Sequence, residues 1–240
     1  MISIITPFYN EENTLISFID TVLSRINDKN TIEEFILVNG ESTDQSVKKI
    51  EERIKSYDWL LPIKLLQSKK SRAIQQNVWA ITAIWEILFF LHADCLPEAW
   101  FETKILEWYH NWKQWWVCHF IRTPQRRRTR LIDILYNHTR SYRCRFWDSW
   151  IIVTKKLFNE IWWFDETMII EEDHVFIMQL RKTKNFFLYP IQLHVSDRLF
   201  QKNGFVKTLL VYTAIHLLFL CGVKQKRLLY LLHCIKWVKN

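Results

Sequence analysis

Glycine is scarce in this sequence, with only three among 240 residues. Average usage of about 7% would give roughly 17 glycines in a chain of this length. Tryptophan, by contrast, occurs 13 times. Tight turns need residues that enter positive φ freely, as glycine does and a bulky indole does not. Two interpretations follow: an aromatic-rich core or sugar-stacking surface, or tryptophans that stand in glycine positions.

Paired cysteines and low-complexity segments are also lacking. The five cysteines are odd in number and include no Cys-x-x-Cys pair, which argues against a disulfide framework and favours reduced thiols in a cytoplasmic setting. No signal peptide is predicted, because Pro7 and Asn10 interrupt the first apolar residues. With 49% hydrophobic residues, the chain is expected to bury one full core.

The sequence has no apolar run of the roughly 20 residues that a membrane-spanning helix needs. Leu209–Leu220 is largely apolar but shorter, and it contains His216. Acidic residues are outnumbered, which gives a formal net charge of +8. We expect residues 1–203 to form the main domain and residues 204–240 a helical segment packed on it. That segment suits either the surface of an anionic membrane or a core or partner-docking position.

Apolar periodicity predicts alternating strands and helices. Strands are expected at residues 2–5, 35–38, 63–66 and 87–91, and a helical pattern follows each of the first three. The fourth strand is apolar throughout, which indicates burial on both faces. Ser42 and Gln45 are spaced as a capping box before the second helix. The pattern predicts an α/β fold, with a mostly parallel central sheet flanked by helices.

Polar clusters occupy the loops around these strands, at residues 6–12, 39–44, 71–77 and 92–94. In open α/β sheets, ligands bind outside the carboxyl ends of the strands. Asp94 is the most informative residue, because an acid at the mouth of a buried strand is costly unless it binds a partner such as a divalent cation. The alternatives are that Asp94 caps a helix after Pro97 or turns the loop.

Five segments, taken in order, carry a resemblance to a known family. They read TPFYNEE at residues 6–12, LVNGESTD at 37–44, SRAIQQN at 71–77, FLHAD at 90–94 and ED at 172–173. Together they resemble family 2 glycosyltransferases of the GT-A fold, in the subgroup with a His-Ala-Asp version of the acidic metal motif. The resemblance runs from Ile2 to about Leu232 and implies a Rossmann-like nucleotide-binding half.

The resemblance implies transfer of a sugar from a nucleotide-diphosphate sugar to an acceptor hydroxyl, with inversion and with Mg²⁺ or Mn²⁺. Asp94 would be the metal ligand, and His92 replaces the first acid of the more common motif. Asn39 stands where the family more often has aspartate. The residues assigned to the nucleotide sugar are Pro7, Tyr9, Glu11, Asn39, Arg72 and Asp94. An ordinary solvated arginine is the alternative for Arg72.

The second half of the chain is expected to supply the acceptor side and the base. Asp173 is the predicted general base, with Glu172 as its acidic neighbour, since an inverting transfer needs a group to take the acceptor's proton. The alternative is a solvated helix start, where carboxylates favour the helix dipole. Asp148 is predicted to shape the acceptor side.

Several tryptophans fall where the family usually carries glycine. They are Trp79, Trp85, Trp147, Trp150, Trp162 and Trp163. Our hypothesis is that the gene reads UGA as glycine and was translated with UGA as tryptophan. Trp100, Trp108 and Trp237 fall where a genuine tryptophan is expected.

The expected partners are the nucleotide-sugar donor and an unknown acceptor, lipid-linked or part of the cell envelope, at the cytoplasmic face of an anionic membrane. Arginines between residues 126 and 145 form the densest basic run. They suit a phosphate, nucleic-acid or membrane-surface patch, or a solvated loop, and nucleic acid is not the expected partner. The alternative function is a noncatalytic protein of the same fold that binds anionic lipid or RNA, which Asn39 and His92 leave open.

Overall fold

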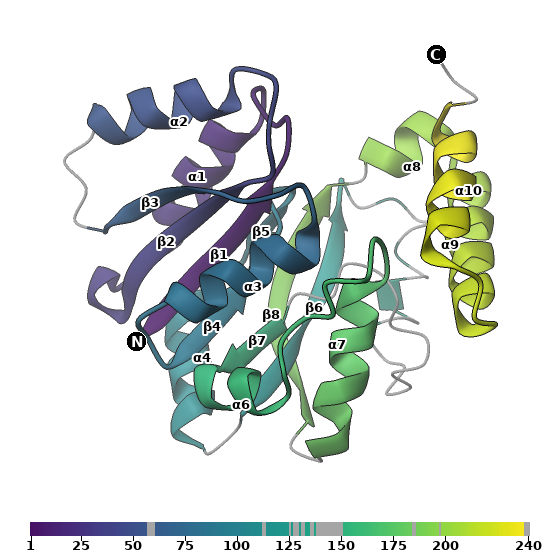
Figure 1. Ribbon diagram of the computed structural model, residues 1–240. Coiled ribbons are helices and arrows are strands. Elements are labelled where there is room, and N and C mark those ends of the chain that lie inside the picture. The colour runs from purple at the N-terminus through teal and green to yellow at the C-terminus, as the bar shows by residue number, and fades with distance from the viewer. Residues whose placement is uncertain are drawn as a thin grey trace.

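The computed structural model describes residues 1–56, 61–111, 114–124, 126, 130, 133–134, 137, 151–183, 186–196 and 198–237. A central sheet carries helices on both faces, and the last two helices stand beside it (Figure 1). The strands are β1 Ile2–Phe8, β2 Ile32–Asn39, β3 Ile63–Gln67, β4 Ile87–Phe90, β5 Cys95–Pro97, β6 Trp115–Thr123, β7 Ile151–Thr154 and β8 Phe186–Ser196. The helices are α1 Leu15–Ser24, α2 Ser46–Lys55, α3 Arg72–Thr82, α4 Phe101–His110, α6 Lys155–Glu160, α7 Glu172–Leu180, α8 Arg198–Asn203, α9 Phe205–Leu220 and α10 Gln225–Trp237.

The strands form one sheet in the order β3-β2-β1-β4-β7-β6-β8-β5. β1 pairs in parallel with β2 and β4, and β2 pairs in parallel with β3. The carboxyl ends of these four strands therefore meet at one edge. β7 runs antiparallel to both β4 and β6, and β5 runs antiparallel to β8. The predicted α/β fold with a helix-flanked sheet is confirmed. β1 to β4 form one parallel block, and β6 and β8 also pair in parallel.

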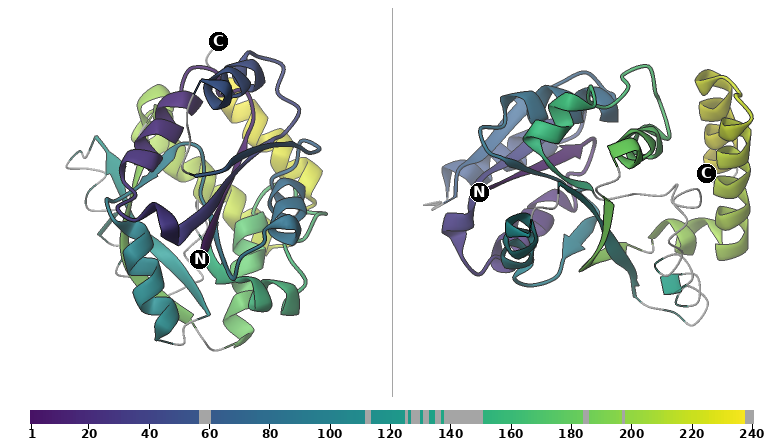
Figure 2. Two further views of the ribbon diagram at one scale, coloured as in Figure 1. Left: turned by 90° about the vertical axis from the view of Figure 1, so that its left-hand side faces the viewer. Right: turned by 90° about the horizontal axis from the view of Figure 1, so that it is seen from below.

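The two faces of the sheet build separate hydrophobic clusters. In β1, Ile4 belongs to a cluster with residues of α1, α2 and α4, whereas Ile5 belongs to one with residues of α3, α6 and α7. This alternation follows from the two-residue period of a strand. The result is a layer of helices on each face, which two further views make visible (Figure 2).

Helix α7 is held to the sheet by aromatic packing. Phe176 stacks on Phe164 with ring centroids 4.0 Å apart and lies 5.5 Å from the ring of Phe158. Aromatic pairs of this kind contribute about 0.5–1.5 kcal/mol beyond their buried area. Asn77 on α3 accepts a hydrogen bond from the backbone N–H of Phe164 and donates one to its carbonyl, both at 2.8 Å. These contacts fix the start of α7 relative to α3.

Three tryptophans adopt the left-handed backbone conformation. The φ angles are 60° at Trp100, 66° at Trp162 and 67° at Trp163. A residue with a side chain pays about 1–2 kcal/mol for this region, whereas glycine enters it freely. Trp162 is 86% exposed, so burial does not offset that cost. The backbone at Trp162 and Trp163 agrees with the glycine hypothesis, and Trp100 shares the conformation.

Two other proposed glycine positions, Trp79 and Trp85, lack this signature. Trp79 lies inside helix α3, and Trp85 is not among the described residues with positive φ. Trp79 is 8% exposed and belongs to the cluster on the α3 face of the sheet. Trp147 and Trp150 lie outside the described residues. The glycine hypothesis therefore remains a prediction at all six positions.

The predicted capping box is wrong. Helix α2 begins at Ser46 with Gln45 as its N-cap, and the Gln45 side chain makes no capping hydrogen bond. The Ser42 hydroxyl instead accepts a hydrogen bond from the backbone N–H of Asn10 at 3.0 Å. Asp44 accepts from the Ser46 N–H at 3.0 Å. Ser42 therefore binds the loop after β1, although its spacing in the sequence suggested that it would cap helix α2.

The C-terminal helices contact the loop that leads into α7. Helices α9 and α10 pack together, and α9 packs on α8. At the start of α10, the side-chain amide oxygen of Gln225 accepts hydrogen bonds from the backbone N–H groups of Ile169 and Ile170, both at 3.1 Å. Among the described residues, each helix is too short or too polar to cross a bilayer. The boundary predicted after residue 203 falls between α8 and α9.

Candidate active site

The loops after β1 and β2 are joined by hydrogen bonds between side chain and backbone. The backbone N–H of Glu11 donates to the Ser46 hydroxyl at 2.9 Å, and the N–H of Thr43 donates to the Asn10 amide oxygen at 2.8 Å. Both loops sit at the carboxyl edge of the parallel strands. These hydrogen bonds hold the two loops together at the edge of the sheet where the sequence predicts the nucleotide-binding site.

Gln75 ties helix α3 to this edge. Its side-chain amide donates to the carbonyl of Val38 at 2.8 Å and to that of Phe8 at 3.3 Å. The approach is so close that a Cβ at Gly40 would lie 2.9 Å from the Gln75 amide. A side chain at position 40 would therefore displace the Gln75 amide from its hydrogen bonds. The start of α3, with Arg72, is fixed over the ends of β1 and β2.

The first three predicted donor residues have different exposures. Pro7 is buried within β1, whereas Tyr9 is 38% exposed and has the Lys70 ammonium 3.6 Å from its ring centroid. The Glu11 carboxylate accepts a hydrogen bond from the Thr14 hydroxyl. Tyr9 is thus the residue of this segment that presents an aromatic surface to solvent, beside a cation that suits a phosphate.

Asn39 is 3% exposed at the end of β2. Its amide nitrogen donates to the Gln67 side chain at 2.6 Å, and its amide oxygen accepts from the Ser42 backbone N–H at 3.0 Å. Each polar atom of the side chain retains one further hydrogen-bonding position. A contact with a base edge would use that remaining capacity while Asn39 holds β2 to β3.

Asp94 lies in the turn between β4 and β5, with its side chain exposed. The carboxylate accepts a hydrogen bond from the Cys95 thiol at 2.9 Å. The helix-cap alternative is wrong, because α4 begins only at Phe101 with Trp100 as its N-cap. The turn alternative describes the backbone correctly and leaves the carboxylate accessible at the mouth of β4.

His92 connects the end of β4 to the start of α7. It is 7% exposed, and its Nε2 atom lies 3.6 Å from a carboxylate oxygen of Asp173. The residues are 81 positions apart in the sequence, so the fold alone brings them together. The sequence motif has His92 in place of an acid, and the structure places it against the predicted base.

The start of α7 is buried, so the solvated-helix alternative for Glu172 and Asp173 is wrong. These residues are only 3% and 9% exposed. Burial, with the Asp173 charge as the second cause, raises the pKa of Glu172 from 4.5 to about 7. The Asp173 Oδ1 atom is buried and accepts no hydrogen bond from the residues that the structure describes. Two adjacent buried carboxyl groups are costly unless partners or a ligand offset their charge.

Arg72 supplies part of that compensation. Its guanidinium lies 3.6 Å from Glu172, although 56% of its side chain is exposed. The position at the first turn of α3 leaves the rest of the guanidinium facing outward. The structure thus gathers Arg72, His92, Glu172 and Asp173 where α3, β4 and α7 meet, with Asp94 two residues beyond His92.

Some predicted site residues lie outside the described residues, and some residues near the site were not predicted. Asp148 lies outside the described residues, as do most arginines of the run from 126 to 145. The sequence analysis did not single out His174, which directly follows Asp173, or assign a contact to His216 in the apolar segment of α9. Gln225 was also missed, because nothing in its local pattern shows that it contacts residues 169 and 170.

Comparison with known proteins identifies the family of the chain. The sequence model described as glycosyl transferase family 2 matches residues 3–160, more than half of the chain. The chain therefore belongs to glycosyl transferase family 2, and the predicted family is confirmed. The prediction of an enzyme agrees with this membership, and the alternative of a noncatalytic protein is not supported. No curated protein sequence matches the chain significantly.

Solved structures of low sequence identity share the fold, which is the predicted GT-A type. TarS residues 1–349 from S. aureus matches with a TM-score of 0.63 at 16% identity, covering 90% of this chain and 65% of TarS 1–349. The mannosyltransferase PcManGT from Pyrobaculum calidifontis matches with a TM-score of 0.65 at 16% identity, covering 90% and 61%. GalNAc-T7 matches with a TM-score of 0.64 at 15% identity, covering 82% and 44%. The chain thus spans less than two thirds of each of these structures.

Proposed function

We propose that the protein transfers a sugar from a nucleotide-diphosphate sugar to an acceptor hydroxyl, with inversion at the anomeric carbon and dependence on Mg²⁺ or Mn²⁺. The observation that carries this proposal is the 3.6 Å approach between His92 Nε2 and Asp173. It brings the predicted base to the strand end that carries Asp94. A site that combines a cation-binding acid with a buried base matches the needs of this reaction.

The donor side is assigned to the joined loops and the start of α3. Tyr9 offers a ring on which a base can stack, and Asn39 and Glu11 offer hydrogen-bonding groups for the base and ribose. Arg72 offers a planar cation for the diphosphate. Solved complexes of the structural relatives support a nucleotide sugar as ligand, since TarS 1–349 was determined with UDP-GlcNAc and PcManGT with GDP-Man.

A divalent cation fits the chemistry at Asp94. The carboxylate is exposed at the strand mouth, and magnesium and manganese favour oxygen ligands from one or two carboxylates and substrate phosphates. PcManGT and GalNAc-T7 were determined with Mn²⁺. When bound, the cation would offset the charge that grows on the leaving diphosphate. We assign Asp94 as its protein ligand.

Asp173 is assigned to take the proton from the acceptor hydroxyl as that oxygen attacks the anomeric carbon. The buried Oδ1 atom is the available acceptor for this proton, because the other oxygen faces His92. Glu172, with its pKa raised to about 7, is protonated in part of the molecules at neutral pH. The partial protonation of Glu172 limits the negative charge next to the base. Asp148 stays assigned to the acceptor side.

A donor panel tests the proposed function. The full chain is incubated with UDP- and GDP-linked sugars, with Mg²⁺, Mn²⁺ or EDTA, and release of nucleotide diphosphate is measured. We expect turnover of at least one donor that stops with EDTA and in Asp94→Asn. Turnover that is equal in EDTA would refute the metal dependence. No turnover of any donor, by this chain and by a variant with glycine at positions 162 and 163, would refute the function.

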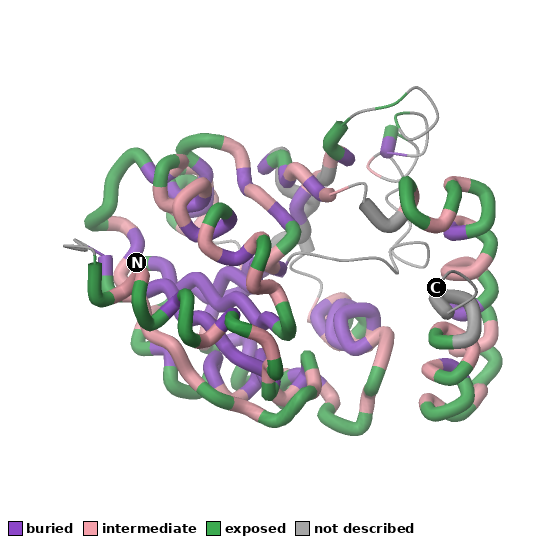
Figure 3. The backbone as a smooth tube through the Cα atoms, turned by 90° about the horizontal axis from the view of Figure 1, so that it is seen from above, coloured by how far each residue is buried: buried purple, intermediate pink, exposed green. Residues whose placement is uncertain are grey.

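We further propose that the acceptor is lipid-linked and reached at the cytoplasmic face of an anionic membrane. Helix α9 exposes an apolar stripe of Val206, Leu210, Leu217 and Leu220, each more than half exposed. Their spacing keeps them on one side of a helix. Residues 198–240 contain lysines and arginines and no acidic residue. Figure 3 shows the described residues of α9 and α10 as mostly exposed or intermediate, in contrast to the buried strands.

Liposome flotation tests the membrane contact. The full chain is expected to float with vesicles that contain phosphatidylglycerol and to stay below with neutral phosphatidylcholine vesicles, because the charge on the segment selects anionic lipid. Replacing Leu210 and Leu217 with glutamate should abolish flotation, whereas Ile84→Glu, at an exposed apolar residue outside the segment, should not. Equal flotation of the α9 variant and the unmodified chain would refute the proposal.

A further inference from the structure

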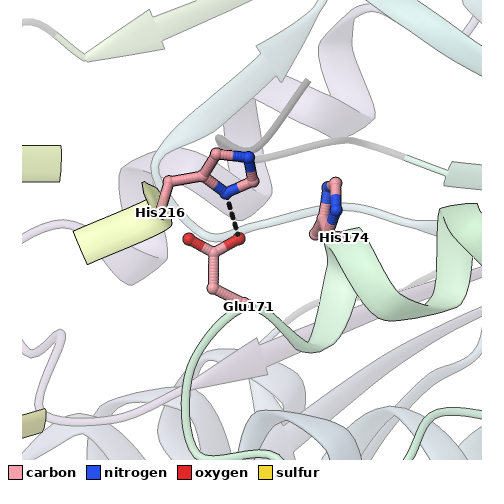
Figure 4. A group of neighbouring side chains, drawn as sticks. All are labelled: Glu171, His174 and His216. Atoms are coloured by element: carbon pink, nitrogen blue, oxygen red, sulfur yellow. Dashed lines mark hydrogen bonds and ion pairs between the residues drawn. The ribbon is translucent and has the colours of Figure 1, made fainter. Parts of the chain in front are cut away.

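Three metal-binding side chains lie side by side at the start of α7, next to the proposed base. They are Glu171, His174 and His216 (Figure 4). One ligand atom from each lies within 4.8 Å of the others, and Glu171 Oε2 is 3.2 Å from His216 Nδ1. The catalytic proposal uses none of the three.

These side chains are buried although they are polar. The Glu171 and His216 side chains are 8% and 4% exposed, and His174 is 4% exposed. Glu171 and His174 come from the start of α7, whereas His216 comes from α9. Burial of such groups is unfavourable without a compensating partner. The cluster therefore joins α7 and α9 through buried polar side chains, at a free-energy cost that an apolar contact would not have.

The donor set matches a divalent transition metal. Two imidazoles and one carboxylate are typical zinc ligands, at about 2.0–2.2 Å from the ion. Tetrahedral geometry at those lengths places ligand atoms about 3.3 Å apart. The Glu171 and His216 atoms already have this separation. The remaining separations, which are within 4.8 Å, would have to close by up to about 1.5 Å on binding.

The backbone at Glu171 adds a second observation. Glu171 is the N-cap of α7 and has a φ of 65°, a conformation that costs a non-glycine residue free energy and that concentrates at ligand sites. Glycine would relieve this cost but would remove the carboxylate from the two histidines. The local strain is consistent with a side chain kept for its ligand atom.

We propose that Glu171, His174 and His216 bind one zinc ion that fastens α9 to the start of α7. The site is nitrogen-rich, so it differs in chemistry from the oxygen site assigned to Asp94, which suits Mg²⁺ or Mn²⁺. Three protein ligands leave a fourth position for water. The ion would hold the residue that precedes Glu172 and Asp173, and it acts as a structural clamp that takes no part in proton transfer.

The competing interpretation is a metal-free contact. His216 would then keep its hydrogen bond to Glu171, and His174 would pack edge-on against the His216 ring, whose centroid is 4.9 Å away. Both interpretations predict that the residues stabilise the fold. Only the zinc site predicts that stability and stoichiometry depend on the ion, so metal retention separates them.

The test measures zinc retention by the full chain without substrate. The protein is stripped with EDTA, incubated with zinc and excess Mg²⁺, passed through a desalting column and analysed for metal. We expect about one zinc per chain in the unmodified protein and in Asp94→Asn. We expect none in His174→Asn, because two ligands hold zinc too weakly to survive the column. His233→Asn, at an exposed histidine of α10, is the matched control and should retain zinc.

Two outcomes would overturn the proposal: no zinc on the unmodified chain, or equal zinc on His174→Asn and the unmodified chain. Circular dichroism checks that His174→Asn is folded, and Glu171→Gln replaces it if it is not. A thermal melt gives an independent readout, since zinc should raise the Tm of the unmodified chain and leave that of the variant unchanged. Because no donor is present, the result is independent of whether the proposed transfer reaction is correct.

Discussion

The parallel half of the sheet and the region around α7 present their site residues in different ways. Tyr9, Asn39 and Asp94 follow directly from the ends of β1, β2 and β4. Asp173 instead stands at a helix start that is positioned by contacts from α3, α9 and α10. The proposed donor side is thus built by strand ends that lie together in any parallel sheet, whereas the position of the proposed base depends on tertiary contacts to buried charges.

This difference determines what each half can tolerate. An exposed acid such as Asp94 carries little of the folding free energy, so its replacement should affect the reaction alone. The buried carboxyls of Glu172 and Asp173 are coupled to stability through Arg72 and His92. Substitutions near α7 should therefore change stability and turnover together, and those at the strand ends should separate the two.

The largest expected effect is that of Asp94→Asn. We expect metal-dependent turnover to fall at least about 100-fold, because the neutral amide binds a divalent cation poorly and the leaving diphosphate loses its compensation. The Tm should stay within a degree or two of the unmodified chain, because the side chain is exposed. Steady-state kinetics across a Mn²⁺ titration checks the effect.

Glu160→Gln, at an exposed acid of α6, is the matched control for Asp94 and should leave turnover unchanged. A fall of Tm by many degrees in Asp94→Asn would show that the donor side is as dependent on buried charge as the base side. That result would contradict the proposed difference between the strand ends and the region around α7.

The next effect is a pH dependence of stability at Glu172. The pKa is raised from 4.5 to about 7 in the folded state, so between these values the folded protein holds a proton that the unfolded chain has released. Stability therefore falls as pH rises through this window, by up to the order of 3 kcal/mol at about 1.4 kcal/mol per pKa unit. Glu172→Gln should remove this loss.

Urea unfolding of the unmodified chain and of Glu172→Gln at pH 5 and pH 8 measures that effect. The variant should gain stability relative to the unmodified chain at the higher pH. Glu51→Gln, at an exposed acid of α2, should show no such gain. A constant difference between Glu172→Gln and the unmodified chain at both pH values would contradict a buried, protonated Glu172.

A smaller effect is expected at Trp162, in the loop between α6 and α7. Glycine should relieve the left-handed strain and raise the free energy of unfolding by about 1 kcal/mol, with little packing lost because the indole is 86% exposed. Trp108→Gly is the contrasting variant. Trp108 lies in α4 and packs on the core, so glycine there should destabilise by about 3 kcal/mol or more.

Denaturant unfolding should give changes in the free energy of unfolding of opposite sign for the two tryptophan variants. Destabilisation by Trp162→Gly would show that the indole has a role in the fold. The codons supply an independent check of the glycine hypothesis. UGA is expected at positions 162 and 163, and UGG there would refute the recoding.

The smallest expected effect is that of Gln225→Ala at the start of α10. The loop residues Ile169 and Ile170 each lose a hydrogen bond at a partly exposed site, which should cost about 1 kcal/mol. We expect kcat to fall several-fold and the KM for the donor to stay constant, because the change loosens the base and leaves the donor loops intact. Gln201→Ala, at an exposed glutamine of α8, should change neither. An increase in donor KM alone would place this contact on the donor side.

The sequence predicted the first strands of the sheet well because their signals are local. The apolar strand at 87–91 and the strand at 2–5 were found within a few residues of β4 and β1, and strand ends in a parallel sheet share one edge. The exception was the capping box, where Ser42 bonds to Asn10 from another loop. Local spacing does not reveal such a competing partner.

The base half could be predicted only in part, because its geometry is made by residues distant in sequence. The pair Glu172 and Asp173 was found from its motif, but its burial depends on the packing of α7. The contact between His216 and Glu171 spans 45 residues. The only sign of this contact in the sequence was a histidine inside an apolar segment. A polar residue in an apolar run indicates that a buried contact exists, but the sequence does not show which residue it contacts.

Asp173→Asn tests the central claim most directly, because it removes the proposed base without changing the size of the side chain. Turnover of the best donor and binding of that donor are measured on the same preparation. We predict that kcat falls by about 10²–10⁴-fold, the range for loss of a general base, while the Kd for the donor changes less than about threefold. Retention of normal kcat, or loss of donor binding with kcat, would contradict the assignment of Asp173 as the base that the fold brings to the donor site.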